Sequence, residues 1–181
     1  QTVPSPQPQP VLAPLTPAHA GRMFTWMKDP WVSDNLGLRS TPSLEATEAW
    51  IARALADEST CPFAILLAGE HVGNVILDRI DRYLSTARLS VYVGENQARA
   101  KGVASTGIWL AVRHGFCELG LHKIWLTVHA LHPAAIRAYV NLGFQVEGVL
   151  RGEFLLRGER VPALYMGILA EEFGKQQTVK T

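Results

Sequence analysis

The sequence has few cysteines, no excess charge of one sign and no long hydrophobic run. Its 2 cysteines, Cys61 and Cys117, are too far apart to form a zinc knuckle or a disulfide framework, so both are expected to be reduced thiols. The 17 basic and 16 acidic residues give a net charge of +1, which argues against a nucleic-acid binder and against a protein that binds anionic membranes. No segment stays apolar over the length that a membrane helix needs.

The length and composition are those of one globular domain. A chain of 181 residues with 48% hydrophobic and 18% charged residues can bury a core without metals or disulfides. Residues 1–10 are rich in proline and lack the basic and apolar regions of a signal peptide, so we expect a flexible leader there. A single domain is expected over residues 11–173, followed by a polar tail over residues 174–181. The expected location is the cytoplasm.

Hydrophobic periodicity predicts an alternating order of short strands and helices, with no internal repeat. The N-terminal half predicts a strand at 11–15, a helix from Pro17 to Asp29, a loop over 31–40, a helix from Thr41 to Asp57, and strands at 63–67, 72–77 and 87–93. The second of these helices is expected to bury Leu44, Ala49, Ile51, Ala52 and Leu55. The C-terminal half predicts a helix from Ala104 to Gly120, a strand at 124–128, a helix from Pro133 to Gly143, and strands at 144–156 and 161–169.

The turn that contains Gly102 has the features of an anion site. Small residues surround the glycine, so a ligand can approach the backbone, and the helix that follows begins with backbone N–H groups that have no intrahelical partner. Such amides, together with the positive end of the helix dipole, can hold a pyrophosphate without a basic surface. A strand-to-helix turn without a ligand explains one glycine equally well. A P-loop and a Rossmann fingerprint do not fit, because the required Gly-Lys-Ser/Thr and the second and third glycines are missing.

Two motifs of the C-terminal half resemble those of the GNAT N-acetyltransferase superfamily. Residues 99–104 (Arg-Ala-Lys-Gly-Val-Ala) match its R/Q-x-x-G-x-G/A signature, and residues 139–144 (Tyr-Val-Asn-Leu-Gly-Phe) resemble its Y-x-K-x-G-F element. Residues 94–166 are similar to the branch that contains ribosomal-protein N-terminal and spermidine acetyltransferases. The resemblance implies an α/β (α+β) GNAT fold. That fold has a mixed central sheet of about seven strands, mostly antiparallel, with a splayed pair of strands and four main helices.

The same resemblance implies an N-acetyltransferase (an acyltransferase) that uses acetyl-CoA as co-substrate and no metal. The backbone of residues 89–93 would splay from its neighbour and pair with the pantetheine arm of CoA. The residues assigned to the cofactor in this way are Val91, Val93, Arg99, Ala100, Lys101, Gly102, Val103, Ala104, Ser105, His132 and Asn141. His132 replaces the usual Asn of the family, Ala135 a Ser and Asn141 a Lys. His129 and His132 have no third ligand nearby in the sequence, so no metal site is predicted.

Tyr139 is the expected catalytic acid. The matching tyrosine of the family lies beside the CoA thiol, and a phenol can protonate a departing thiolate. Without that context, a tyrosine that merely packs in a helix would be the default interpretation. No general base is assigned, because Arg88 stands where many members have a Glu, and a water chain or an already neutral amine would also serve. The remaining titratable candidates are Asp78, Asp81, Glu153 and His129, each interpreted as a surface or strand-end group.

The amine acceptor is the least defined part of the prediction. In the family the first two helices and the loop between them line the acceptor cleft, which gives Trp31, Asn35 and Arg39 as candidate substrate-binding residues. Only Asp29 and Asp34 lie near them, too few carboxylates for a polyamine. A small-molecule primary amine such as an amino sugar, free or nucleotide-linked, and a protein N-terminus are therefore favoured. A non-catalytic CoA-binding regulatory module is the alternative, and the family leaves a homodimer open.

Overall fold

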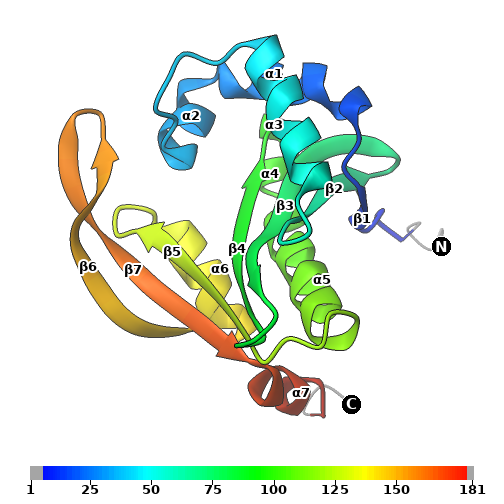
Figure 1. Ribbon diagram of the computed structural model, residues 1–181, viewed down its shortest axis with the longest axis vertical. Coiled ribbons are helices and arrows are strands. Elements are labelled where there is room, and N and C mark those ends of the chain that lie inside the picture. The colour runs from blue at the N-terminus through cyan, green and yellow to red at the C-terminus, as the bar shows by residue number, and fades with distance from the viewer. Residues whose placement is uncertain (1–5, 179–181) are drawn as a thin grey trace, which may run out of the picture.

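The computed structural model describes residues 6–178, which are built around a seven-stranded sheet (Figure 1). The strands are β1 (Val11–Pro14), β2 (Cys61–Leu67), β3 (Glu70–Asp81), β4 (Thr86–Val93), β5 (Lys123–His129), β6 (Gln145–Leu156) and β7 (Glu159–Leu169). Their order is β1-β2-β3-β4-β5-β7-β6, and every neighbouring pair is antiparallel except β4 and β5. The expected mixed and mostly antiparallel sheet is confirmed.

The parallel strands β4 and β5 separate along their length. Their register joins only residues 86–88 to residues 123–125, although β4 continues to Val93 and β5 to His129. On its other side, β4 is paired with β3 as far as Val93. Within residues 6–178, no strand therefore covers the edge of residues 89–93 that faces β5. This is the splayed pair that the family resemblance implies.

Helices cover both faces of the sheet (Figure 1). They are the short 3-10 helix η1 (Pro17–His19) and α1 (Ala20–Met27), α2 (Pro30–Leu36), α3 (Leu44–Ala56), α4 (Asn96–Arg99), α5 (Val103–Cys117), α6 (Pro133–Leu142) and α7 (Ala170–Thr178). Residues 6–178 thus contain seven α-helices, against four main helices expected. None of the helices in this part of the chain reaches the length and hydropathy that a membrane span requires.

The prediction of a loop over residues 31–40 is wrong for its first half, because these residues belong to α2. The Asp29 carboxylate accepts a hydrogen bond from the Trp31 N–H at 2.9 Å, Pro30 occupies the first turn, and Gly37 ends the helix with a φ of +63°. Asp29, expected as the last residue of the preceding helix, is thus the N-cap of the next one. With only Val32 buried, α2 has no apolar period for a pattern search to find.

Of the five residues that α3 was expected to bury, only Ile51 is buried, and Ala49 and Ala52 are exposed. The helix is capped by Ser43, and its buried residues are Thr47, Ile51 and Ala54, which follow one another at helical spacing. Leu44 and Leu55, which the pattern placed inside, are 40% and 48% exposed. The polar Thr47 is accommodated because its hydroxyl donates to the Ser43 carbonyl at 2.9 Å, a bond that the hydrophobic pattern does not reveal.

Each face of the sheet has its own core. Under α5 and α6 the core includes Val75, Leu89, Ile108, Ile124 and Met166. On the opposite face a second core fixes α1, α2 and α3 on the strands through Leu15, Met23, Trp26, Val32 and Ile51. The odd residues of β4 pack into the first core, and Tyr92 packs against the second. The second face is called here the acceptor face, because it carries the helices expected to line the acceptor cleft.

Trp26 fixes the end of β4 from the acceptor face. The side chain is 4% exposed, and its indole N–H donates to Glu95 at 2.8 Å. A Cβ at Gly94 would collide with the Trp26 ring, so only glycine fits at the end of this strand. Trp26 is therefore a core residue.

The ends of the chain are only partly described. Residues 1–5 of the expected leader and residues 179–181 of the expected tail lie outside the described residues. Before the tail, α7 follows β7, and Phe173 of this helix packs against Phe116 and Trp109 of α5.

Candidate functional site

Gly102 lies in the turn that connects α4 to α5. It is the N-cap residue of α5, with a left-handed φ of +68°, and a Cβ there would meet nothing within 4 Å. The backbone conformation therefore favours glycine, and the space in front of it is open. No side chain caps the helix, so the first N–H groups of α5 remain available to an anion.

The other residues of this turn differ in exposure. Ala100 and Lys101 are exposed, Val103 is fully buried, and Ala104 and Ser105 are half-buried. Val103 can thus reach a ligand only through its backbone.

At Val91 and Val93 of β4, as at Val103, the side chain is packed inside while the backbone can still reach a ligand. Both side chains pack into the core under α5. Their backbone belongs to the strand segment that β5 leaves uncovered. Strand-like pairing with a ligand and core packing are therefore compatible at these two residues.

The Arg99 side chain connects β4 to α2. Its Nε donates to the Val93 carbonyl at 3.1 Å, and its Nη2 donates to the Gly94 carbonyl and to Asp29 Oδ2, both at 3.1 Å. The guanidinium also lies 3.9 Å above the Trp31 ring centre, and the side chain is 17% exposed. Its charge is thus engaged away from the turn, and only the Arg99 backbone lies at the predicted anion site.

His132 caps α6 beside the open end of the splayed strands. Its Nδ1 accepts a hydrogen bond from the Ala135 N–H at 3.4 Å. The neutral ring therefore carries its proton on Nε2, and that N–H can be donated to a ligand. Burial lowers the pKa of His132, which favours this neutral form. Asn141, nine residues further along the chain, is exposed, and its side chain has no hydrogen bond in the described part of the chain, so it does not join this group.

Tyr139 lies two turns after His132 on the same face of α6. It is 7% exposed, and its ring meets Phe144 edge-on with centroids 5.6 Å apart. Burial raises the pKa of Tyr139 to about 12, so the hydroxyl stays protonated at neutral pH. Among residues 6–178 no group forms a hydrogen bond with this hydroxyl, which leaves its proton available for a ligand.

Helix α2 brings two of the three acceptor candidates to the end of β5. The Trp31 ring lies edge-on to the His132 ring at 6.2 Å. Asn35 Oδ1 lies 3.0 Å from His129 Nε2. Arg39 is exposed beyond α2 and has no polar partner in the described residues, so it is not part of this group. The His129 and His132 rings are 5.5 Å apart, and residues 6–178 hold no group of three metal-ligating side chains that could bind a metal ion.

Of the candidate bases, His129 is the one buried at the open end of the splayed strands. Arg88 binds Asp78 through Nε at 2.8 Å and Nη2 at 2.6 Å, at the end where β4 and β5 are paired. Asp81 caps a turn at that same end, and Glu153 is exposed on β6. His129 ends β5 and is 5% exposed. It is thus a strand-end group, as expected, but not a surface group, because α2 and β6 cover the end of this strand.

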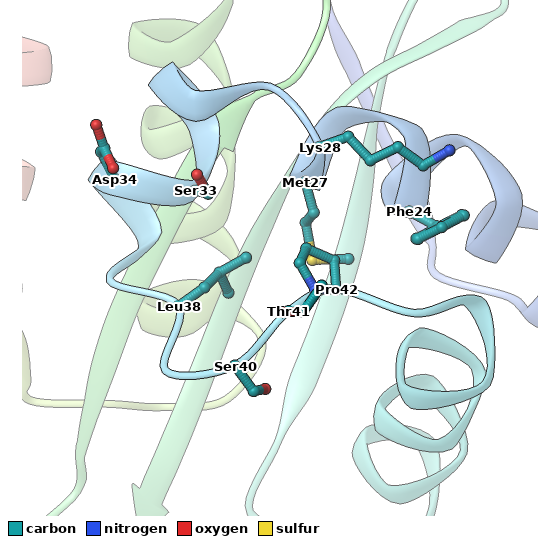
Figure 2. Close-up of a pocket in the computed structure, with 9 residues that line it drawn as sticks. All are labelled: Phe24, Met27, Lys28, Ser33, Asp34, Leu38, Ser40, Thr41 and Pro42. Atoms are coloured by element: carbon teal, nitrogen blue, oxygen red, sulfur yellow. The ribbon is translucent and has the colours of Figure 1, made fainter.

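A hollow of about 590 Å³ opens between α1, α2 and residues 38–42 (Figure 2). Its lining residues are Phe24, Met27, Lys28, Ser33, Asp34, Leu38, Ser40, Thr41 and Pro42. The only carboxylate among them, Asp34, is bound to Arg157 of the β6–β7 turn at 2.8 Å. The other carboxylate near α2, Asp29, is bound to Arg99. Both acidic side chains of this region are therefore already paired.

Sequence reasoning missed a buried hydrogen-bond chain on the acceptor face. His71 Nε2 lies 2.7 Å from Asn74 Oδ1, and Asn74 Nδ2 donates to the Tyr92 hydroxyl at 2.8 Å. Burial raises the pKa of Tyr92, which keeps the hydroxyl protonated. The one sequence signal of these hydrogen bonds was a polar Asn inside the apolar run at residues 72–77, because a buried amide requires partners.

Comparison with known proteins agrees with these features. A family model described as an acetyltransferase (GNAT) domain matches residues 11–145. The spermidine N(1)-acetyltransferase of Escherichia coli K12 is 32% identical over 117 residues, which are 65% of this chain and 62% of that protein. The Vibrio cholerae enzyme of the same name is 32% identical over 102 residues, 56% of this chain and 58% of that protein. The chain thus matches less than two thirds of the length of these relatives.

The structural comparison extends over more of the chain. A crystal structure of spermidine N-acetyltransferase from Vibrio cholerae in complex with CoA and spermine is 25% identical to this chain, with a TM-score of 0.86. The match covers 91% of this chain and 98% of that one. The names of these relatives agree with the resemblance of residues 94–166 to the branch that contains spermidine acetyltransferases.

Proposed function

This chain belongs to the GNAT acetyltransferase family, and we propose that it transfers the acetyl group of acetyl-CoA to a primary amine. The observation that carries the proposal is the uncovered edge of residues 89–93, which opens beside the N-cap of α6. The other requirements are met nearby, by free amides at the start of α5 and by a buried, protonated Tyr139.

The donor would be held mainly by backbone groups. The amides that follow Gly102 bind the pyrophosphate. The backbone of Val91 and Val93 pairs with the pantetheine arm as an added strand, and one N–H of this strand polarises the thioester carbonyl. His132 contributes its Nε2–H. This division explains how the chain binds an anionic cofactor with a net charge of only +1.

The chemical step requires an uncharged amine and a proton for sulfur. The amine nitrogen attacks the thioester carbonyl carbon, a C–N bond forms, and the C–S bond then breaks. Tyr139 protonates the departing thiolate and recovers a proton from the nitrogen through solvent. A pKa of about 12 keeps the Tyr139 phenol protonated before each turnover, so the proton is present when the thiolate departs.

For the acceptor, the names of the relatives support an aliphatic polyamine such as spermidine as the first class to test. The ion pairs of Asp29 with Arg99 and of Asp34 with Arg157 support a second class, because neither carboxylate is free to bind a polycation. That class is an amino sugar or a protein N-terminus. The expected cytoplasmic location, and the homodimer that the family leaves open, belong to the same proposal.

The test is release of free thiol from acetyl-CoA with a panel of amines: spermidine, glucosamine and a peptide with a free N-terminus. We expect at least one amine to release thiol in proportion to the N-acetyl product that mass spectrometry detects. Binding of acetyl-CoA without turnover on any amine would instead support a non-catalytic CoA-binding module.

A further inference from the structure

His129 is a buried histidine with one ring nitrogen left unpartnered. The residue is 5% exposed, and its Nδ1 is buried without a hydrogen-bond partner in the described residues. Buried polar atoms in folded proteins almost always have a partner, so an orphaned nitrogen requires an explanation. The residue closes β5 at the end where this strand has left β4. It lies between Asn35 of α2, Phe154 of β6 and His132 of α6.

The hydrogen bonds around Asn35 fix the tautomer of His129. Asn35 Nδ2 donates to the Trp31 carbonyl at 2.7 Å, and a carbonyl can only accept, so this side of the amide must be its NH₂ group. Oδ1 therefore faces His129 Nε2, 3.0 Å away. Since Oδ1 can only accept, Nε2 must carry the proton of the neutral ring. The basic lone pair of His129 is thus on Nδ1, the atom without a partner.

The surroundings keep the ring neutral. Burial lowers the pKa of His129, and the neighbouring His132 lowers it further. The groups packed against it from α2 and β6 are the uncharged Asn35 and Phe154.

The charged side chains of α2 and the β6–β7 turn, Asp34 and Arg157, form an ion pair with each other at 2.8 Å. On the other side of Trp31, Arg99 is paired with Asp29. His129 therefore has no carboxylate partner in the described residues that would hold it protonated, and at neutral pH it is a base.

We propose that His129 Nδ1 accepts the proton that the ammonium group of the acceptor must lose before it attacks acetyl-CoA, and that Asn35 is the positioning residue that fixes its tautomer. The inference rests on the proposed function and assigns the general base that the sequence left open. An ammonium group supplies the hydrogen-bond donor that Nδ1 lacks. Burial lowers the pKa of the bound ammonium group, so its pKa comes closer to that of His129.

The protons balance as follows. The ammonium N–H bond breaks, its proton forms a bond with Nδ1, and His129 becomes an imidazolium while the nitrogen lone pair attacks the carbonyl carbon. The nitrogen loses its second proton after the C–N bond has formed, and this proton replaces the one that Tyr139 gives to sulfur. His129 then releases its proton to solvent. The sum is ammonium plus acetyl-CoA to amide, CoA thiol and one proton.

The proposal predicts a specific pH dependence. An aliphatic amine with a pKa of about 10.4 is neutral in only about one molecule in 2,500 at pH 7. An enzyme without the base must wait for that neutral form. A positioned base increases the reaction rate about 10²- to 10⁴-fold. We therefore expect His129→Gln to lower kcat/KM for the amine about 100-fold at pH 7 and about 10-fold at pH 8, with no loss left near pH 9.

The choice of variants separates base catalysis from packing. In His129→Gln the side-chain amide retains a donor for Asn35 Oδ1 but has no titratable group. His122→Gln makes the same change at an exposed histidine just before β5, at the opposite end of the strand, and should behave as wild type. Asn35→Asp places a carboxylate on Nε2, which raises the pKa of His129. In that variant the acid limb of the kcat/KM profile should move to higher pH.

The results distinguish the possible failures. A loss in His129→Gln that is equal at every pH, or no loss at all, overturns the assignment of His129 while the wild type remains an active acetyltransferase. Equal profiles for Asn35→Asp and wild type overturn the role of Asn35. If the wild type releases no thiol with any amine, the proposed function fails, and this step fails with it.

Discussion

Replacement of Gly102 by alanine tests whether the turn before α5 is a ligand site or only a turn. Gly102 has a φ of +68°, and a Cβ there would meet nothing within 4 Å. The substitution therefore produces no clash in the unliganded protein. Its cost is the strain of an L-residue in the left-handed region, about 1 to 2 kcal/mol. For a chain of this size the corresponding fall in Tm is about 2 to 8 °C.

Gly120 provides a matched control at the other end of α5. Its φ is +65°, and a Cβ there would also meet nothing within 4 Å. Gly120→Ala should therefore cost the same stability as Gly102→Ala. Only Gly102, however, lies at the helix start where the free N–H groups would bind pyrophosphate. A methyl group in that space lengthens hydrogen bonds to a charged group, and such bonds contribute about 1.5 to 3 kcal/mol each.

The assay is calorimetric titration of CoA into both variants, with urea unfolding to compare their stabilities. We expect the two to unfold alike, while Gly102→Ala binds CoA at least about tenfold more weakly than Gly120→Ala, which corresponds to about 1.4 kcal/mol. Affinities within twofold of each other would refute the cofactor role of this turn. Unequal stabilities would refute the strain argument.

Three further predictions concern side chains of the site and core. Tyr139→Phe should lower kcat about 100-fold while the Kd for CoA stays within twofold, and an unchanged rate of thiol release would remove Tyr139 from the mechanism. Arg99→Met should reduce the free energy of unfolding in urea by about 2 kcal/mol, because two backbone carbonyls lose the buried cation that binds them. The exposed Arg39 is the control, and Arg39→Met should change this free energy by less than about 0.5 kcal/mol. Similar losses in the two variants would contradict the account. Burial lowers the pKa of His71 from 6.5, so the unfolded chain binds this proton first, and stability should fall as the pH drops below about 6.5. His71→Gln should flatten that fall, and a protein that gains stability on acidification would contradict it.

The sheet and the long helices could be predicted because their signals are local. Alternating apolar residues mark the strands, and α6 has both a Pro at its start and Gly143 at its end, with a φ of +104°. The α2 helix was missed because its signals are capping residues rather than a period. The register that leaves residues 89–93 uncovered depends on how β5 packs, and only the family resemblance indicated it.

The acceptor side could not be predicted because its contacts are long-range. The hydrogen bond of His129 with Asn35 joins residues 94 positions apart, and that of Arg157 with Asp34 joins residues 123 positions apart. No local pattern encodes such pairs. At Arg99 a local pattern exists but misleads about the side chain. The motif that contains Arg99 indicates a cofactor site, whereas its guanidinium binds Asp29 and the end of β4.

A crystal structure of the protein with CoA bound tests the central claim most directly. The account predicts pyrophosphate oxygens within hydrogen-bond distance of the backbone N–H groups that follow Gly102, the pantetheine arm along residues 89–93, and the CoA sulfur beside the Tyr139 hydroxyl. A CoA molecule bound elsewhere, with the edge of residues 89–93 still uncovered and Tyr139 far from sulfur, would contradict it.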